Sequence, residues 1–191
     1  MQRWTIKQLL EWTTNYFREK NIKEARLEAE ILLARVLDQD RVYLYANYDA
    51  PINKDERTIF REFIKRRIRK EPLAYITGCR EFMSLEFAVN TAVLIPRPES
   101  ELLVEIGLDL LKDKPGSTIC DIGTGSGAIA ISLAYYLPSV QVFATDISRA
   151  ALDTARVNAD RHQVEVQLRE GDLISPFLDE ENYFDLIVAN L

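Results

Sequence analysis

The sequence has little cysteine, a single histidine and no long apolar run. Its two cysteines, Cys79 and Cys120, lie far apart, so the chain is not a disulfide scaffold and a reducing compartment suits it. No stretch approaches the ~20 apolar residues that a membrane helix needs. The charged first residues lack the apolar core of a signal peptide. We therefore expect a cytoplasmic protein that does not interact with membranes.

Glycine and proline are also scarce, with seven of each in 191 residues. The chain has 47% hydrophobic and 28% charged residues, which excludes disorder and collagen-like repeats. This composition is typical of an ordinary globular protein of one or two domains.

Charge is distributed unevenly along the chain. Residues 1–90 carry 17 Lys and Arg against 14 Asp and Glu, whereas residues 91–191 carry 7 against 16. Because an acidic surface repels phosphate backbones, strong nucleic-acid binding would have to lie in the first half. The asymmetry suggests two units with different roles.

Residues 1–72 are predicted to form a small helical bundle. Thr5 and Gln8 have the spacing of a capping box, as do Asn53 and Glu56. Apolar residues recur at helical spacing over 25–37, a shorter helix is expected near 42–47, and Pro72 ends the last helix. A basic run over 61–70 is most simply a solvated helix face.

Residues 73–95 are predicted to form a β-hairpin linker. Residues 75–95 are rich in β-formers, and Leu85, Phe87 and Val89 alternate with other residues as in a half-buried strand. A rigid Pro-Arg-Pro turn follows at 96–98 and opens a helix. The expected apolar face of that helix consists of Leu102, Leu103, Ile106 and Leu110.

From residue 96 the pattern predicts a Rossmann-like α/β domain. Strands are expected at 118–122, 140–145, 164–168 and 184–189, with helices at 128–137 and 150–160. This alternation indicates a parallel sheet with right-handed crossovers. Because functional loops follow the carboxyl ends of such strands, we expect the domain, which stops after its fourth strand, to be incomplete at its C-terminus.

The first candidate site is a glycine loop at residues 123–127, after the first parallel strand and before a helix. Glycines there allow a sharp turn and a close approach to a ligand. The G-x-G-x-G spacing, with Asp121 two residues upstream, differs from the dinucleotide fingerprint G-x-G-x-x-G. It resembles motif I of class I S-adenosylmethionine (SAM) methyltransferases. The candidate cofactor-binding residues are Gly123, Thr124, Gly125, Ser126 and Gly127. The alternative is a tight turn without a ligand.

Two further acidic positions follow strands. Asp146 ends the second parallel strand, where a carboxylate can accept hydrogen bonds from ribose hydroxyls; the alternative is a helix cap, for which Ser148 also serves. Asp172 and Leu173 follow the third strand. In methyltransferases such a pair often contacts adenine, although the dipeptide Gly171-Asp172 on its own more often forms a turn.

Asn190 stands at the carboxyl end of the fourth strand, in the sequence DLIVANL. A buried amide is costly without hydrogen-bond partners. Asn190 therefore either closes a turn or begins an N-P-P-Y-like motif, which opens the substrate pocket of enzymes that methylate amide or amino nitrogens.

Nearly the whole chain resembles the PrmC/HemK family of release-factor glutamine N5-methyltransferases. The resemblance is carried by PLAYITG at 72–78, by Glu81, Phe82, Phe87 and Val89, by LIPRPESE at 94–101, by DIGTGSG at 121–127, and by Ala150, Ala151, Leu152, Ala155 and Asn158. Two positions depart from the family pattern. Ser100 replaces the usual Thr, and Leu191 stands where the family has its first motif Pro.

The resemblance implies that SAM donates its methyl group to the side-chain nitrogen of the glutamine in the Gly-Gly-Gln loop of class I peptide-chain release factors. Residues 1–72 would recognise that protein, and residues 96–191 would bind SAM. Asn190, as the catalytic residue, and the backbone carbonyl of Leu191 would bind the glutamine amide. No metal and no general base are expected, and His162 is expected to be a surface residue. Without the rest of the motif, the 191 residues are expected to be inactive.

Two other functions remain open at this stage. The same Asn-led motif serves N6-adenine methyltransferases of RNA or DNA, although the acidic second half argues against direct nucleic-acid binding. The chain could also be a non-catalytic adaptor that binds SAM or a protein. Arg97 could order the turn after the hairpin or reach the carboxylate of the cofactor, and the basic run could contact an acidic release-factor surface.

Overall fold

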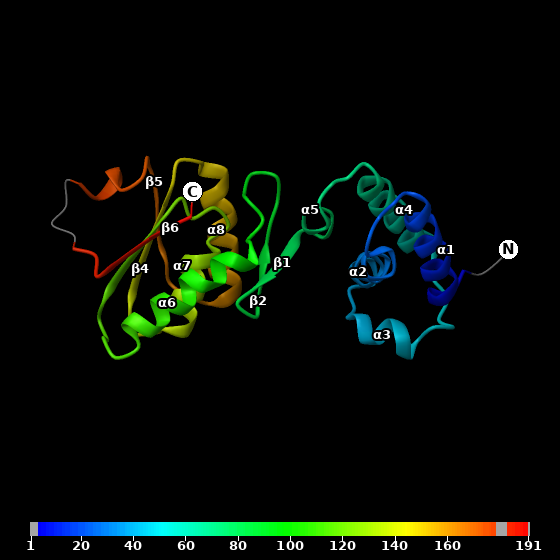
Figure 1. The fold of residues 1–191 in the computed structure, drawn as a ribbon, viewed down its shortest axis with the longest axis horizontal. Helices are drawn as coiled ribbons and strands as arrows, with labels where there is room; N and C mark the ends of the chain where they lie inside the picture. Colours follow the sequence, from blue (N-terminus) through cyan, green and yellow to red (C-terminus); the bar gives the residue numbers. More distant parts are fainter. Residues whose placement is uncertain (1–3, 179–182, 191) are drawn as a thin grey trace. The chain divides into compact units, whose positions relative to one another are not determined.

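A computed structural model describes residues 4–178 and 183–190. The chain divides into an N-terminal unit, Met1–Thr77, and a C-terminal unit, Gly78–Leu191 (Figure 1). Each unit has its own apolar core. In the described part of the chain, no helix is both long and apolar enough to span a bilayer.

The described residues of the N-terminal unit form five helices. They are α1 (Ile6–Glu19), α2 (Ala25–Leu37), α3 (Arg41–Ala46), α4 (Lys54–Ile68) and α5 (Leu73–Thr77). Both predicted capping boxes are present: Thr5 caps α1 with Gln8, and Asn53 caps α4 with Glu56. Such caps satisfy backbone N–H groups that a helix start leaves unpaired.

The basic run on α4 is only partly a solvated face. The guanidinium of Arg67 pairs with Glu28 of α2, with one N–O distance of 2.9 Å, and Arg66 pairs with Glu71. Two of the basic side chains therefore tie α4 to its neighbours within the bundle. Arg61 remains exposed and has no hydrogen bond or ion pair among the described residues.

The C-terminal unit opens with an antiparallel hairpin of β1 (Cys79–Phe82) and β2 (Leu85–Ala88). Met83 and Ser84 have φ of 49° and 58°, which matches the positive φ at both central residues of a type I′ hairpin turn. The expected β-rich stretch began at residue 75, but residues 75–77 belong to helix α5. The helix forms there because the backbone N–H groups of Tyr75 and Ile76 donate to the carbonyl of Pro72.

The central sheet is parallel and has the strand order β5-β4-β3-β6. Its strands are β3 (Thr118–Ile122), β4 (Gln141–Asp146), β5 (Gln167–Glu170) and β6 (Leu186–Ala189). The third parallel strand was predicted to begin at residue 164 but begins at Gln167. Helix α8 extends to His162, and its C-cap residue, Gln163, has a φ of 55°. The chain then needs residues 164–166 to reach β4, with which β5 pairs from Gln167 onward.

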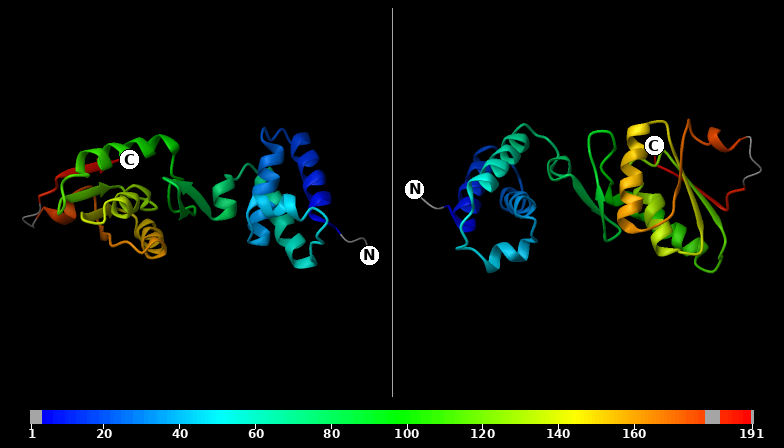
Figure 2. Two further views of the ribbon diagram at one scale, coloured as in Figure 1. Left: turned by 90° about the horizontal axis from the view of Figure 1, so that it is seen from below. Right: turned by 180° about the vertical axis from the view of Figure 1, so that it is seen from behind.

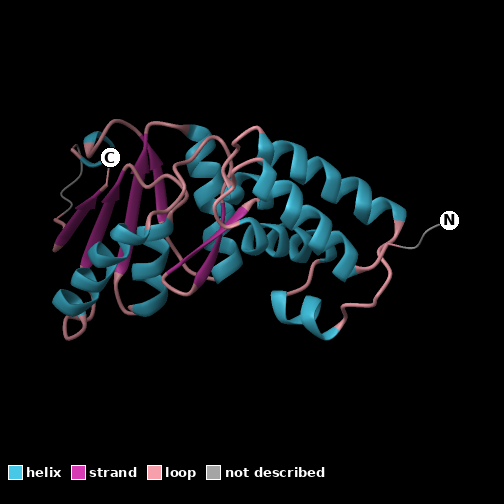
Figure 3. Ribbon diagram, turned by 45° about the vertical axis from the view of Figure 1, so that its right-hand side comes forward, coloured by secondary structure: helices cyan, strands magenta, loops and turns pink. Residues whose placement is uncertain are grey.

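Helices α6 (Glu101–Leu111), α7 (Ala128–Tyr136) and α8 (Arg149–His162) contact one another in sequence and pack on the sheet (Figures 2 and 3). Two short 3-10 turns, η1 (Pro98–Ser100) and η2 (Ser175–Phe177), complete the elements. Strand residues alternate between two clusters: Ile119 packs in the main core, whereas Cys120 packs against Phe143 and Phe177 on the other face. This alternation is the expected two-residue period of a strand.

The predicted apolar face of α6 is largely wrong. Leu102, Ile106 and Leu110 are 58%, 48% and 52% exposed, whereas Val104, Gly107 and Leu111 are buried. Because α6 is apolar on most sides, its periodicity cannot identify the packed face. The glycine identifies it, since a Cβ at Gly107 would lie 2.9 Å from Leu133 Cδ2 of α7.

Candidate functional site

The glycine loop connects the end of β3 to the start of α7. Gly123, Gly125 and Gly127 have φ of 69°, 55° and 80°, in the left-handed region that favours glycine. This backbone turns the chain sharply from strand to helix at the carboxyl edge of the sheet, where ligands bind in open α/β folds.

Two of these glycines are required for different reasons. A Cβ at Gly127 would lie 2.6 Å from Ile131 Cδ1 and 3.1 Å from the Cβ of Ala155, so Gly127 lets α7 pack closely against α8. A Cβ at Gly125 would meet no atom within 4 Å. Gly125 therefore faces open space and leaves the cleft side of the loop accessible to a ligand.

Asp121 holds the glycine loop and the start of α7 through side-chain hydrogen bonds. Its side chain is 1% exposed, and Oδ2 accepts hydrogen bonds from Thr124 Oγ1 at 2.7 Å and from the backbone N–H of Ala130 at 3.3 Å. Burial raises the pKa of Asp121 to about 7 against the opposing effect of these hydrogen bonds, and the Asp146 carboxylate raises the pKa further. The sequence singled out this position only by its spacing from the glycines.

Asp146 lies beside the glycine loop. Its Oδ2 accepts a hydrogen bond from the backbone N–H of Gly125 at 2.9 Å, and its Oδ1 accepts one from Ser148 N at 2.8 Å. The side chain that caps α8 is that of Ser148, which accepts from Ala151 N. A carboxylate has about four lone-pair sites, so Asp146 retains acceptor capacity for ligand hydroxyls.

Asp172 and Leu173 follow β5 at the same edge of the sheet. The backbone N–H of Gly171 donates to the carbonyl of Asp146, and the Leu173 carbonyl accepts from Thr145 Oγ1 at 2.8 Å. Leu173 is 50% exposed. Both residues are near Asp146, but neither lines the cleft described next.

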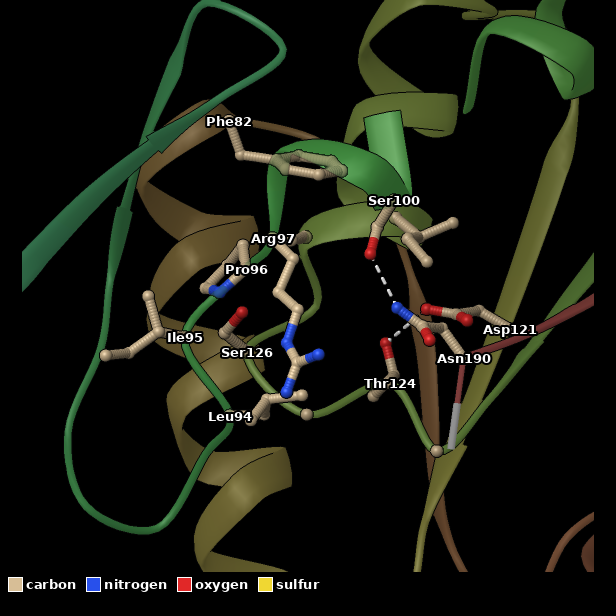
Figure 4. A pocket seen from close by; sticks show the side chains of 14 residues that line it. Phe82, Leu94, Ile95, Pro96, Arg97, Ser100, Asp121, Thr124, Ser126 and Asn190 are labelled. Atoms are coloured by element: carbon tan, nitrogen blue, oxygen red, sulfur yellow. Dashed lines mark hydrogen bonds between the residues drawn. The ribbon is translucent and has the colours of Figure 1, made fainter. Parts of the chain in front are cut away.

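A cleft separates the glycine loop from the segment that follows the hairpin (Figure 4). Its lining from that side consists of Phe82, Leu94, Ile95, Pro96, Arg97 and Ser100. The opposite side includes Asp121, residues 123–126, Ala128, Ile129 and Asn190. Phe82, Leu94, Ile95, Pro96 and Ser100 were not predicted as site residues, although all of them lie in the motifs on which the resemblance depends.

Asn190 closes one side of the cleft. Its Nδ2 donates a hydrogen bond of 2.5 Å to Ser100 Oγ (Figure 4). No hydrogen-bond partner of Asn190 Oδ1 occurs among the residues that the structure describes. The predicted substrate contact of Leu191 lies outside the described residues.

Sequence reasoning also missed the role of Asn158 of α8. The side chain is fully buried, and its Nδ2 donates to the carbonyls of Ser126 at 2.8 Å and Ala88 at 3.0 Å. Its Oδ1 accepts from Ala88 N at 2.7 Å. Asn158 thus connects the glycine loop to β2, and its signal was its place in the motif that the resemblance includes.

Comparison with known protein families finds a match for each of the two units. Residues 8–78 match the PrmC N-terminal domain, and residues 99–190 match the methyltransferase small domain. The chain is 45% identical over 188 residues to the release factor glutamine methyltransferase of Geobacter sulfurreducens, covering 98% of this chain and 64% of the relative. It is 42% identical over 198 residues to that of Chlorobaculum tepidum, covering 98% of this chain and 67% of the relative.

Among solved structures, the chain is similar over part of its length to a 16S rRNA N2 G1207 methyltransferase of T. thermophilus, at 24% identity and a TM-score of 0.48. That match covers 59% of this chain and 32% of the other. The chain spans about two thirds of the length of the curated relatives that it matches. On the strength of those relatives, the chain belongs to the release factor glutamine methyltransferase family.

Proposed function

We propose that the protein carrying this chain transfers a methyl group from SAM to the side-chain amide nitrogen of a glutamine, in the Gly-Gly-Gln loop of a class I release factor. The observation that carries the proposal is the position of Asn190, whose amide lines the same cleft as the glycine loop. Family membership supports the choice of substrate.

The chain has the groups that a SAM site needs. Gly125 leaves open space above the loop, and the Asp146 carboxylate has acceptor capacity for the two ribose hydroxyls. Asp172 and Leu173 follow β5 at the same sheet edge, where they would contact the adenine. Bound there, SAM supplies an electrophilic methyl group on a sulfonium.

Asn190 addresses the main chemical difficulty of the reaction. An amide nitrogen is a poor nucleophile because its lone pair is delocalised into the carbonyl. Asn190 Oδ1 and the backbone carbonyl of residue 191 would accept its two N–H bonds and hold the nitrogen in line with the methyl group. Positioning of this kind contributes roughly 7–11 kcal/mol in the most favourable cases.

The N-terminal unit is proposed to recognise the release factor. The cofactor candidates from Gly123 to Leu173 all belong to the C-terminal unit, which leaves the helical unit available for a protein partner. The unit has an apolar groove of about 490 Å³ between α1 and α4, lined by Trp12, Tyr16 and Phe60 and by the basic Arg57, Arg61 and Lys65. We propose that this partner is met in the cytoplasm.

A labelled-methyl assay tests the function. The protein carrying this chain is incubated with labelled SAM and release factor, with a release factor whose loop glutamine is replaced by asparagine, and with RNA and DNA. Label is expected only in the intact factor, and Asn190→Ala should abolish transfer while SAM binding, measured by calorimetry, persists. Label in nucleic acid would favour an adenine methyltransferase, and SAM or release-factor binding without transfer would favour an adaptor.

A further inference from the structure

Ser100 occupies a helix start without acting as a cap. It is the N-cap residue of α6, where a serine side chain usually accepts a backbone N–H, yet its hydroxyl makes no capping bond. The residue is only 7% exposed. Its Oγ instead accepts the 2.5 Å hydrogen bond from Asn190 Nδ2, across 90 residues of sequence.

This contact engages one end of the Asn190 amide. An asparagine side chain has a donor end and an acceptor end of nearly the same shape, and its terminal torsion is broad and roughly two-fold. A serine hydroxyl can accept from Nδ2 or donate to Oδ1, and in the structure Ser100 Oγ accepts from Nδ2. With Nδ2 held by Ser100, Oδ1 remains available as an acceptor on the cleft.

The position of Ser100 is itself fixed. Its backbone N–H donates to the Arg97 carbonyl at 3.0 Å, which closes the turn η1. The neighbouring Glu101 accepts a hydrogen bond from Met83 N at 2.8 Å, so the start of α6 is also tied to the hairpin turn. A supporting group on a rigid element can orient a functional side chain accurately.

We propose that Ser100 is a positioning residue that holds Asn190 with its carbonyl oxygen toward the cleft. The cleft then accepts a hydrogen bond from its substrate, and it selects a nitrogen that carries hydrogen over a bare carbonyl acceptor. This assignment rests on the proposed function, in which Asn190 contacts the glutamine amide. In this proposal Ser100 acts on the reaction through Asn190.

The alternative is a purely structural tie between α6 and the end of β6. Three variants separate the two roles. Ser100→Ala removes the hydroxyl, Ser100→Thr keeps it, and Ser132→Ala is a matched control. Ser132 of α7 is fully buried in the same unit, but its hydroxyl has no hydrogen-bond partner among the described residues.

The first measurement needs no activity and uses the protein that carries this chain. Hydrogen exchange of the Asn190 side-chain amide is followed by nitrogen-15 NMR. Exchange of one Nδ2 proton slower than in a free amide is expected in wild type, Ser100→Thr and Ser132→Ala, with exchange at the rate of a free amide in Ser100→Ala. Unchanged exchange in Ser100→Ala would overturn the proposal.

The second measurement uses the protein that carries this chain. Ser100→Ala should lower kcat by about 10- to 100-fold, the usual effect of removing a group that orients a binding residue. The SAM dissociation constant and the melting temperature should stay close to wild type, and Ser100→Thr should restore kcat. Full activity in Ser100→Ala, or a loss explained by weaker SAM binding or lower stability, would contradict the positioning role.

Together, the exchange measurement and the activity measurement distinguish a failure of the positioning role of Ser100 from a failure of the proposed function. If the wild-type protein methylates no glutamine, the proposed function fails, and the exchange measurement still decides whether Ser100 orients Asn190. If the wild type is active and both arms are insensitive to Ser100→Ala, only the positioning role fails.

Discussion

The Asp146 carboxylate accepts a hydrogen bond from the Gly125 backbone N–H at 2.9 Å, and this bond joins the end of β4 to the glycine loop that follows β3. One side chain thus sets the loop conformation and presents its remaining lone pairs beside the loop. We therefore expect substitution of Asp146 to change cofactor affinity.

Asp146→Ala should weaken SAM binding by about 1–3 kcal/mol, because it removes the ribose acceptor and leaves the Gly125 N–H unpaired. Isothermal calorimetry on the protein carrying this chain measures the change. Asp153→Ala, which removes an exposed carboxylate from the surface of α8, is the charge-matched control and should bind as wild type. Equal affinity in wild type and Asp146→Ala would refute the assignment.

The two glycines should differ in their effect on SAM binding. Gly127→Ala should lower the free energy of unfolding by about 1–3 kcal/mol, because a strained φ of 80° adds to contacts of 2.6 and 3.1 Å with Ile131 and Ala155. Gly125→Val is also strained, at a φ of 55°, but it should in addition reduce SAM affinity, because its side chain would enter open space on the cleft. Thermal melting and calorimetry report the two effects, and equal melting temperatures for Gly127→Ala and wild type would contradict the packing role.

Asp121 should make stability depend on pH. Its pKa is about 7 in the folded chain against 3.8 for the ordinary side chain, so the folded state binds the proton more tightly. The free energy of unfolding from this group should therefore be greatest below about pH 4 and should fall as the pH rises to about 7.

Asp121→Asn should remove this part of the pH dependence, since the amide oxygen can still accept from Thr124. Denaturant unfolding at a series of pH values compares the two proteins. Parallel curves between pH 4 and 7 would show that Asp121 does not titrate abnormally.

The groove of the N-terminal unit should affect recognition of the intact release factor. Combining Trp12→Ala with Arg61→Glu should raise KM for the factor and leave methylation of a short Gly-Gly-Gln peptide unchanged, because the peptide need not reach the groove. Removing residues 1–72 should abolish methylation of the factor and spare SAM binding. Val42→Ala, at a 72% exposed position of α3 outside the groove lining, is the control. An unchanged KM in the double variant would exclude the groove as a docking site.

The 191-residue chain should self-associate and show no glutamine methylation. In the described residues β6 pairs only with β3, and Ile187 is 48% exposed on this edge strand. Leu102 and Ile106 of α6 are 58% and 48% exposed. Exposed apolar edges favour association between chains. Light scattering and the labelled-methyl assay test both expectations, and an active, monodisperse monomer would show that the active site has been misplaced.

Local chemistry was predictable from the sequence alone. Capping boxes at Thr5 and Asn53, the strand at 118–122 and the glycine loop depend on residues within a few positions of one another, and all are found in the structure. The spacing of Asp146 from the glycines likewise predicted a shared strand edge, because parallel strands end on one side of a sheet.

Tertiary structure determined the features that depend on contacts between residues far apart in the sequence. The packed face of α6 was ambiguous because apolar residues cover most of the helix circumference, and the close approach of Leu133 to Gly107 identifies it. The contacts of Asn158 with Ser126 and of Ser100 with Asn190 span 32 and 90 residues. A sequence pattern can mark such residues, but it cannot state their partners, because hydrogen bonds of this kind exist only once the sheet and its helices have brought the segments together.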